Sequence, residues 1–96
     1  MTTYTPETID ASHISLAPDL QELVETLAKN NHDHWAISRI KEGWRHGERR
    51  SDDDKLHPDL IPYDQLPDSE KDYDRKTVTE ALKAIMALGY EVKKQH

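Results

Sequence analysis

Large aliphatic side chains are scarce in this chain, and their scarcity limits what it can fold into. Nine Leu, six Ile and three Val give 18 such residues in 96, and there is no Phe. This share is close to that of disordered proteins. A chain of this length forms one small domain that buries only about 60–65% of its unfolded surface. Folding therefore depends on how the apolar residues are spaced, and a deep catalytic cleft within one copy is not expected.

Charge and composition exclude several classes of protein. Thirteen basic residues against 19 acidic ones give a net charge of −6, which argues against general nucleic-acid binding. Because there is no cysteine, disulfides and thiolate metal sites are excluded. The chain has no run of 18 apolar residues and no N-terminus of the secretory type. We therefore expect a cytoplasmic protein without a membrane segment.

The first stretch with helical periodicity begins near Pro18, a residue that suits the first turn of a helix. Gly43 suits the left-handed position that follows a helix end. The predicted buried stripe consists of Leu20, Val24, Leu27, Asn31, His34 and Trp35. Because His34 lies on this stripe, we expect it to be buried and hydrogen-bonded. Ile37 and Ile40 lie on roughly the opposite side, so the helix either has two buried faces or bends near residues 30–31.

The second helical stretch is expected to start with Asp68 or Ser69 as its N-cap. Gly89 should end it, with Tyr90 folding back onto Ile85 in a Schellman motif. Its predicted apolar face consists of Val78, Ala81, Leu82, Ile85 and Leu88. We expect residues 90–92 to form a short strand that pairs with the N-terminal arm.

The predicted organisation is an N-terminal arm over residues 1–15, a domain over 16–92 and a tail over 93–96. Within the domain, residues 45–67 connect the two helical stretches and contain three of the five prolines. A structureless loop of this length is uncommon inside a small domain, so we expect an irregular but ordered segment. The predicted fold class is mainly α: a small single domain with two main helical elements, a long ordered connecting segment and minor short β-strand content.

The strongest local signal is basic and aromatic. Residues 39–50 hold five basic and two acidic residues, a local charge of +3. Indole rings stack on planar groups, and arginine forks match phosphate oxygens. The candidate residues for binding a nucleotide-like anionic planar ligand are Trp35, Trp44, Arg39, Arg45, Arg49 and His57. Alternatively, the two tryptophans are the main core residues of a chain without Phe, and Arg39 only stacks on Trp44.

Catalytic and metal-binding signals are weak. Asp52, Asp53 and Asp54 lack the mid-loop glycine and the final Glu of a calcium loop. His32 and His34 are two residues apart on a predicted helix, so they point in different directions. No nucleophile or phosphate-binding motif is present. We therefore expect a protein that is not an enzyme and that has no metal site and no cofactor.

Ordered motifs along nearly the whole chain carry a family resemblance. They are His34-Trp35-Ala36, Arg39-Ile40, Glu42-Gly43-Trp44, Gly47, Asp52-Asp53, Lys55, His57-Pro58, Leu60-Ile61-Pro62-Tyr63, Leu66-Pro67, Ser69-Glu70-Lys71, Tyr73-Asp74-Arg75, Leu82-Lys83-Ala84-Ile85 and Ala87-Leu88-Gly89-Tyr90. The chain resembles the ryanodine-receptor repeat, or RyR domain, over about residues 4–92. This resemblance implies a mostly helical module with minor strand content. We expect the single-copy prokaryotic or phage type, for which neither a pore nor calcium conduction is implied.

The resemblance also implies a function. Members of the family are associated with nucleotide-derived ligands, and the tryptophans of the H-x-W and G-W motifs, here Trp35 and Trp44, would be the stacking groups. The chain departs from the common pattern at His46, where many members have Tyr, and over residues 48–51. Family members often work in pairs, so a homodimer or another protein partner is the alternative to a small-molecule ligand.

Overall fold

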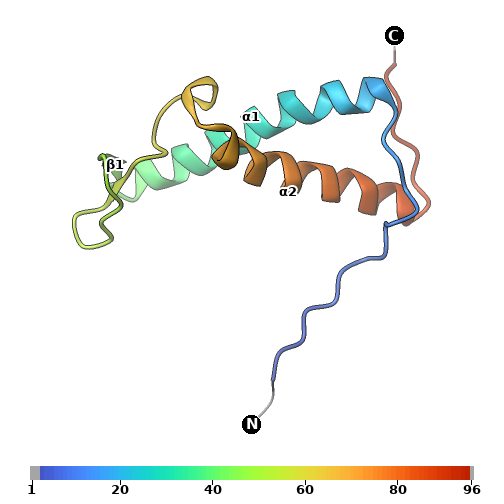
Figure 1. Ribbon diagram of the computed structural model, residues 1–96, viewed down its shortest axis with the longest axis horizontal. Helices are drawn as coiled ribbons and strands as arrows, with labels where there is room; N and C mark the ends of the chain where they lie inside the picture. Colours follow the sequence, from blue (N-terminus) through green and yellow to red (C-terminus); the bar gives the residue numbers. More distant parts are fainter. Residues whose placement is uncertain (1–2, 96) are drawn as a thin grey trace.

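The computed structural model describes residues 3–95 and consists of two helices joined by a folded connection (Figure 1). Its elements are α1 (Pro18–Lys41), β1 (Arg45–His46), β2 (Leu56–His57), the 3-10 helix η1 (Tyr63–Gln65) and α2 (Asp68–Ala87). The mainly α class expected from the sequence is confirmed. Residues 1, 2 and 96, which belong to the expected arm and tail, lie outside the described residues.

Both helices end in the same way, as the two Gly-aromatic pairs predict. Gly43 has φ +94° and Gly89 has φ +96°, values that favour glycine. The Trp44 N–H donates to the Arg39 carbonyl at 3.0 Å, and the Tyr90 N–H donates to the Ile85 carbonyl at 3.2 Å. Each of these is the long hydrogen bond of a Schellman motif, which turns the chain back over the last helical turn.

The helix starts are only partly as predicted. Pro18 lies in the first turn of α1, which runs without a break to Lys41. Of the two alternatives for this helix, a second buried face is wrong, because Ile37 and Ile40 are 49% and 60% exposed. The predicted N-cap of α2 is wrong, because the capping position belongs to Pro67 and carries no side-chain cap. Asp68 is the first helical residue instead, and its carboxylate complements the positive end of the helix dipole.

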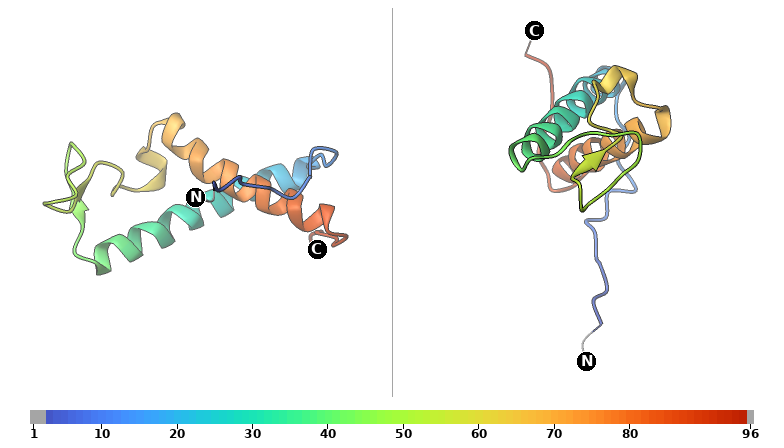
Figure 2. Two further views of the ribbon diagram at one scale, coloured as in Figure 1. Left: turned by 90° about the horizontal axis from the view of Figure 1, so that it is seen from below. Right: turned by 90° about the vertical axis from the view of Figure 1, so that its left-hand side faces the viewer.

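The buried side of α1 has two partners in succession. Val24 packs with Val78 and Leu82 of α2. One turn later, Ala28 packs with Tyr63 and Leu66 of the connection. In Figures 1 and 2, α2 runs back along α1, and the connection lies near the C-terminal half of α1. The core is therefore a line of contacts along α1.

This succession changes which residues of α1 are buried. The fully buried set is Leu20, Val24, Ala28 and His32, at a spacing of four. A spacing of four advances about 40° around the helix at each step, so the stripe rotates from α2 towards the connection. The prediction for His34 is consequently wrong: His34 is exposed, whereas His32 is 4% exposed and bonds through Nε2 to the Ile61 carbonyl at 2.8 Å.

The predicted apolar face of α2 is only half used. Val78 and Leu82 are buried against α1, whereas Ala81 is exposed, Ile85 is 40% exposed and Leu88 is 62% exposed. The predicted strand at residues 90–92 is wrong, since no strand occurs between residues 88 and 95. Val92 instead packs on the Val24 cluster, and the N-terminal arm extends away from the helices (Figure 1).

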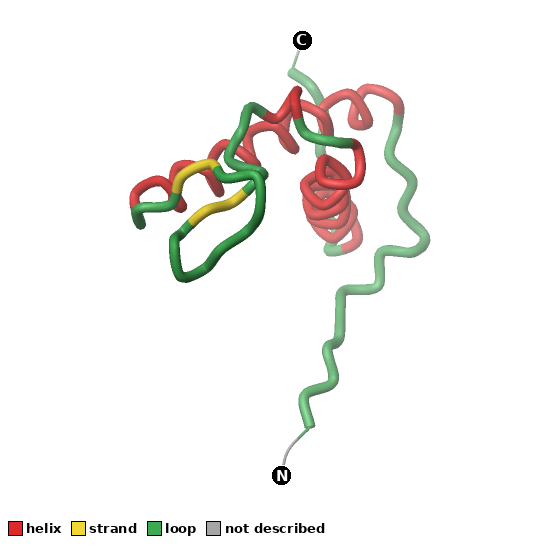
Figure 3. The backbone as a smooth tube through the Cα atoms, turned by 60° about the vertical axis from the view of Figure 1, so that its left-hand side comes forward, coloured by secondary structure: helices red, strands yellow, loops and turns green. Residues whose placement is uncertain are grey.

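The connection between the helices holds the two short strands, which pair in parallel (Figure 3). Arg45 pairs with Leu56, and His46 pairs with His57. Lys55 ties this loop to α1, because its Nζ donates to the Glu42 carbonyl at 2.7 Å. Among the described residues, no helix is both long and apolar enough to cross a membrane.

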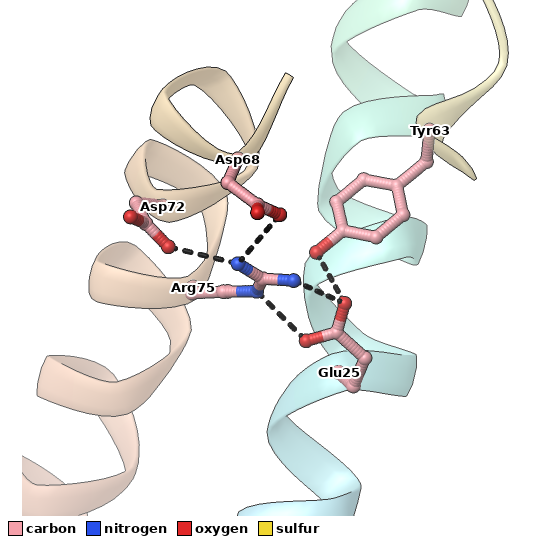
Figure 4. A network of polar contacts seen from close by, with 5 residues as sticks. All are labelled: Glu25, Tyr63, Asp68, Asp72 and Arg75. Atoms are coloured by element: carbon pink, nitrogen blue, oxygen red, sulfur yellow. Dashed lines mark hydrogen bonds and ion pairs between the residues drawn. The ribbon is translucent and has the colours of Figure 1, made fainter. Parts of the chain in front are cut away.

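A polar network joins α1, η1 and α2 (Figure 4). Arg75 donates through Nε and Nη2 to the two carboxylate oxygens of Glu25, at 2.8 and 3.0 Å. The Tyr63 hydroxyl donates to Glu25 Oε1 at 2.8 Å. On its other side Arg75 bonds to Asp72 at 2.9 Å and lies 3.7 Å from Asp68. Such bidentate charged contacts fix the relative positions of the groups they join.

The network shifts the ionisation of its members. The hydrogen bonds from Arg75 and Tyr63 lower the pKa of Glu25. Burial, together with the bond to Glu25, raises the pKa of Tyr63 to about 12. Both shifts favour the charge states that the network needs at neutral pH, namely an ionised Glu25 and a neutral Tyr63.

We predict that acid weakens this network through Glu25. Because folding lowers the pKa of Glu25, its contribution to stability is fully present above the ordinary value of 4.5 and is lost as the pH falls through the folded-state value. Urea denaturation between about pH 3 and 6 measures this loss. Glu25→Gln should flatten the acid limb, and a variant with an unchanged pH dependence would contradict the prediction.

Candidate functional site

Arg39 lies against both tryptophans at the end of α1. Its guanidinium carbon is 5.0 Å from the centroid of the Trp44 ring and 5.9 Å from that of Trp35. Trp35 and Arg39 are one helical turn apart and therefore share a face. Trp44 reaches the same place because the turn at Gly43 folds the chain back over Arg39. A local helix-ending motif thus assembles the indole and guanidinium groups.

His57 completes this group, which we call the Trp–Arg–His cluster: Trp35, Arg39, Trp44 and His57. Strand β2 brings its ring to 4.9 Å from Trp35, edge to face, and to 6.3 Å from Trp44. Trp44 is 9% exposed, whereas Trp35 is half-buried. Since Arg39 and His57 both lie against the two indoles, a flat ligand has to bind at the outer edge of the cluster or displace one of these side chains.

The other two predicted arginines lie beside the cluster, in the β1 strand and the loop that follows it. Arg45 is exposed on β1, where its backbone N–H bonds to the Lys55 carbonyl. Arg49 is exposed in the loop, and its neighbour Arg50 is paired with Asp52 at 2.9 Å. The structure therefore gathers four of the six predicted site residues and leaves Arg45 and Arg49 as exposed positive groups nearby.

A cavity of about 240 Å³ lies next to the cluster, between α1, the connection and α2. Its lining comprises His32, Trp35, His57, Asp59, Leu66, Glu70, Tyr73 and Asp74. Trp35 and His57 thus belong both to the cluster and to the wall of the cavity. Asp59 raises the pKa of Glu70 because their side chains are within hydrogen-bonding reach of each other.

The sequence model of the RyR domain family matches residues 4–94 of this chain. The chain belongs to the RyR domain family. The match runs from the N-terminal arm through both helices and the connection, so it includes every residue of the cluster and of the cavity lining. The family resemblance noted in the sequence is confirmed by this match.

Sequence reasoning missed the carboxylates of this RyR domain's cavity. Asp59, Glu70 and Asp74 come from two segments and share no spacing with Trp35 or with each other that marks a site. In so acidic a chain, paired carboxylates are also too common to single out. Among residues 3–95, no group of three His, Asp or Glu side chains is placed to hold a metal ion.

His57 is the titratable residue of the cluster with a perturbed pKa. Burial is the main cause that lowers the pKa of His57, with Arg50 and Arg39 adding to the effect and Asp59 opposing it. The Asp59 N–H donates to Nδ1 at 3.0 Å, so the neutral ring carries its hydrogen on Nε2. His57 is therefore neutral at physiological pH and presents one N–H donor.

We predict that His57 titrates below its ordinary pKa of 6.5. In Asp59→Asn the midpoint should fall further, because the carboxylate that favours the protonated ring is removed. Histidine ring signals followed by NMR against pH measure both values. A midpoint at or above 6.5 in the wild-type protein would contradict the burial of the ring, and a rise in Asp59→Asn would contradict the role of Asp59.

Proposed function

We propose that this RyR domain is a non-catalytic binding module for a nucleotide-like anionic ligand, which it holds at the Trp–Arg–His cluster. The observation that carries the proposal is the position of Arg39, whose guanidinium lies against both indoles. Cation–π contacts of this kind hold a guanidinium in place while leaving its in-plane N–H donors available. Among the described residues, Arg39 has no carboxylate partner within ion-pair distance.

The two tryptophans have different roles in this proposal. Trp44 is nearly buried, so its ring packs against the Arg39 guanidinium and offers little surface to a ligand. Trp35 is half-buried and is the better stacking surface for a planar ring. Exposed Arg45 and Arg49 then lie close enough in the chain to add positive charge for phosphate groups.

We predict that calorimetric titration and thermal shift with ATP, ADP, AMP, ADP-ribose and cyclic nucleotides detect binding of at least one of them. Arg39→Ala should weaken this binding by about tenfold or more, since a charged donor to phosphate is lost. Trp35→Ala should weaken it similarly, because a stacked base contributes about 1–3 kcal/mol.

The matched control for Arg39→Ala is Lys41→Ala, which removes one positive charge from the same end of α1. This variant should bind the nucleotide nearly as well as the wild-type protein. Equal weakening by Lys41→Ala would show that only general charge matters. Absence of binding by every nucleotide at millimolar concentration, with the protein folded, would overturn the proposal.

Self-pairing is a second candidate function, and it is favoured by an uncharged groove between α1 and α2. This groove of about 350 Å³ is lined by Leu27, Asn30, Asn31, His34, Val78, Ala81, Leu82 and Ile85. No Asp, Glu, Lys or Arg lines it, although these types make up 33% of the chain. Two copies that each carry a charge of −6 can meet here without facing carboxylates, and interface cores are depleted of charge in this way. We propose a second copy of the chain as the occupant.

We predict that light scattering across a concentration series shows a rise from monomer to dimer mass. Ile85→Glu should keep the protein monomeric, because it places a charge in the groove. Thr26→Glu adds the same charge at an exposed position of α1 outside the groove and should pair like the wild type. A wild-type monomer at all concentrations, or equal loss in both variants, would contradict self-pairing.

A further inference from the structure

The cavity beside the Trp–Arg–His cluster has a chemistry opposite to that of the arginines. Three carboxylates line it, Asp59 from the connection and Glu70 and Asp74 from α2. None of its eight lining residues is Lys or Arg. Trp35 and His57 belong both to the cluster and to the cavity lining, so the three carboxylates lie next to the cluster that contains Arg39.

Among residues 3–95, none of these three carboxylates forms an ion pair with a Lys or Arg side chain. The side chains of Asp59 and Glu70 are within hydrogen-bonding reach, and this proximity raises the pKa of Glu70. Two ionised carboxylates at such a distance repel each other, and a bound cation relieves the repulsion. Asn31 donates to Asp74 at 2.8 Å and positions this carboxylate, and Nδ1 of His32 lies 3.9 Å from it.

Apart from Leu66, the other residues that line the cavity carry aromatic rings, and these rings indicate what kind of cation fits. Trp35, His57 and Tyr73 contribute rings, and Tyr73 is 71% exposed at the opening. Aromatic faces attract organic cations by cation–π contact. A metal ion fits poorly, since no three His, Asp or Glu side chains of residues 3–95 are placed to ligate one. Carboxylates combined with rings therefore indicate an organic cation.

Size and shape narrow the class further. Pockets for whole drug-sized ligands occupy about 300–1,000 Å³, so a cavity of about 240 Å³ takes the end of a molecule. A guanidinium group is flat enough to lie along an indole. Its N–H fork matches neighbouring carboxylates better than the compact ammonium of lysine does.

We propose that this cavity binds a guanidinium-type organic cation, with Asp59, Glu70 and Asp74 accepting its N–H groups and Trp35 and Tyr73 lying against its plane. The cation is either a free small molecule or the arginine side chain of a peptide, because both present the same group. This site is additional to the nucleotide-like site proposed above, with which it shares Trp35 and His57.

The test is a titration of the full chain with agmatine, with the peptide Gly-Arg-Gly, and with the same peptide carrying neutral citrulline in place of arginine. Calorimetry gives the affinity, and the NMR signal of the Trp35 indole N–H reports the location. We expect at least one of the two guanidinium compounds to bind and to shift this signal, and the citrulline peptide to do neither. Binding of agmatine identifies a free cation as sufficient, and binding of the peptide alone identifies a side chain of a protein partner.

The variants separate a site from general attraction to an acidic protein. Glu70→Gln and Asp59→Asn each keep the side-chain shape and should weaken binding about tenfold. Asp53→Asn removes the same charge from an exposed loop position outside the cavity and should leave the affinity within about twofold. Thermal unfolding of each variant verifies that it is folded.

Three outcomes would overturn the proposal: citrulline binding that equals arginine binding, a loss in Asp53→Asn equal to that in Glu70→Gln, or no binding of either guanidinium compound at millimolar concentration. The result is independent of the nucleotide-like site. Arg39→Ala should weaken nucleotide binding and leave guanidinium binding unchanged. Glu70→Gln should weaken guanidinium binding and leave nucleotide binding unchanged.

Discussion

Both hydrophobic clusters of this domain depend on one helix, α1. Val24 anchors α2, and Ala28 anchors the connection through Tyr63 and Leu66. Because large apolar residues are few, no large side chain in the described part of the chain is buried to below 2% exposure, and polar contacts have to complete the assembly. Glu25 lies between the two clusters in the chain, and its carboxylate binds Arg75 of α2 and Tyr63 of η1. Residues 24–28 of α1 therefore contact both α2 and the η1 part of the connection.

The Trp–Arg–His cluster forms at the C-terminal end of α1 because the chain turns back there. The left-handed Gly43 turns the chain so that Trp44 returns onto Arg39, and Lys55 holds the β1–β2 loop against the same helix end. His57 thereby joins this cluster and also lines the cavity that contains Asp59, Glu70 and Asp74.

Local patterns in the sequence predicted the elements well. Pro18, Gly43 and Gly89 mark helix boundaries by backbone geometry alone, and they lie where the structure has them. The prediction failed where burial depends on a distant partner. His34 fits an ideal stripe, but the stripe rotates because α1 leaves α2 for the connection, so His32 is buried in its place. The prediction of a strand at residues 90–92 was wrong for a similar reason. Val92 packs on the Val24 cluster, and the N-terminal arm, its predicted partner, extends away from the helices.

The sequence by itself determined the helical class, the two glycine-ended helices and the meeting of Arg39 with its neighbouring indoles, because these depend on backbone preferences and on contacts within a few residues. Only the tertiary structure decided that His57 joins this cluster and that Asp59, Glu70 and Asp74 share a cavity with Trp35. Those residues come from segments that are far apart in the chain. Their proximity arises from packing against α1, which no local spacing encodes.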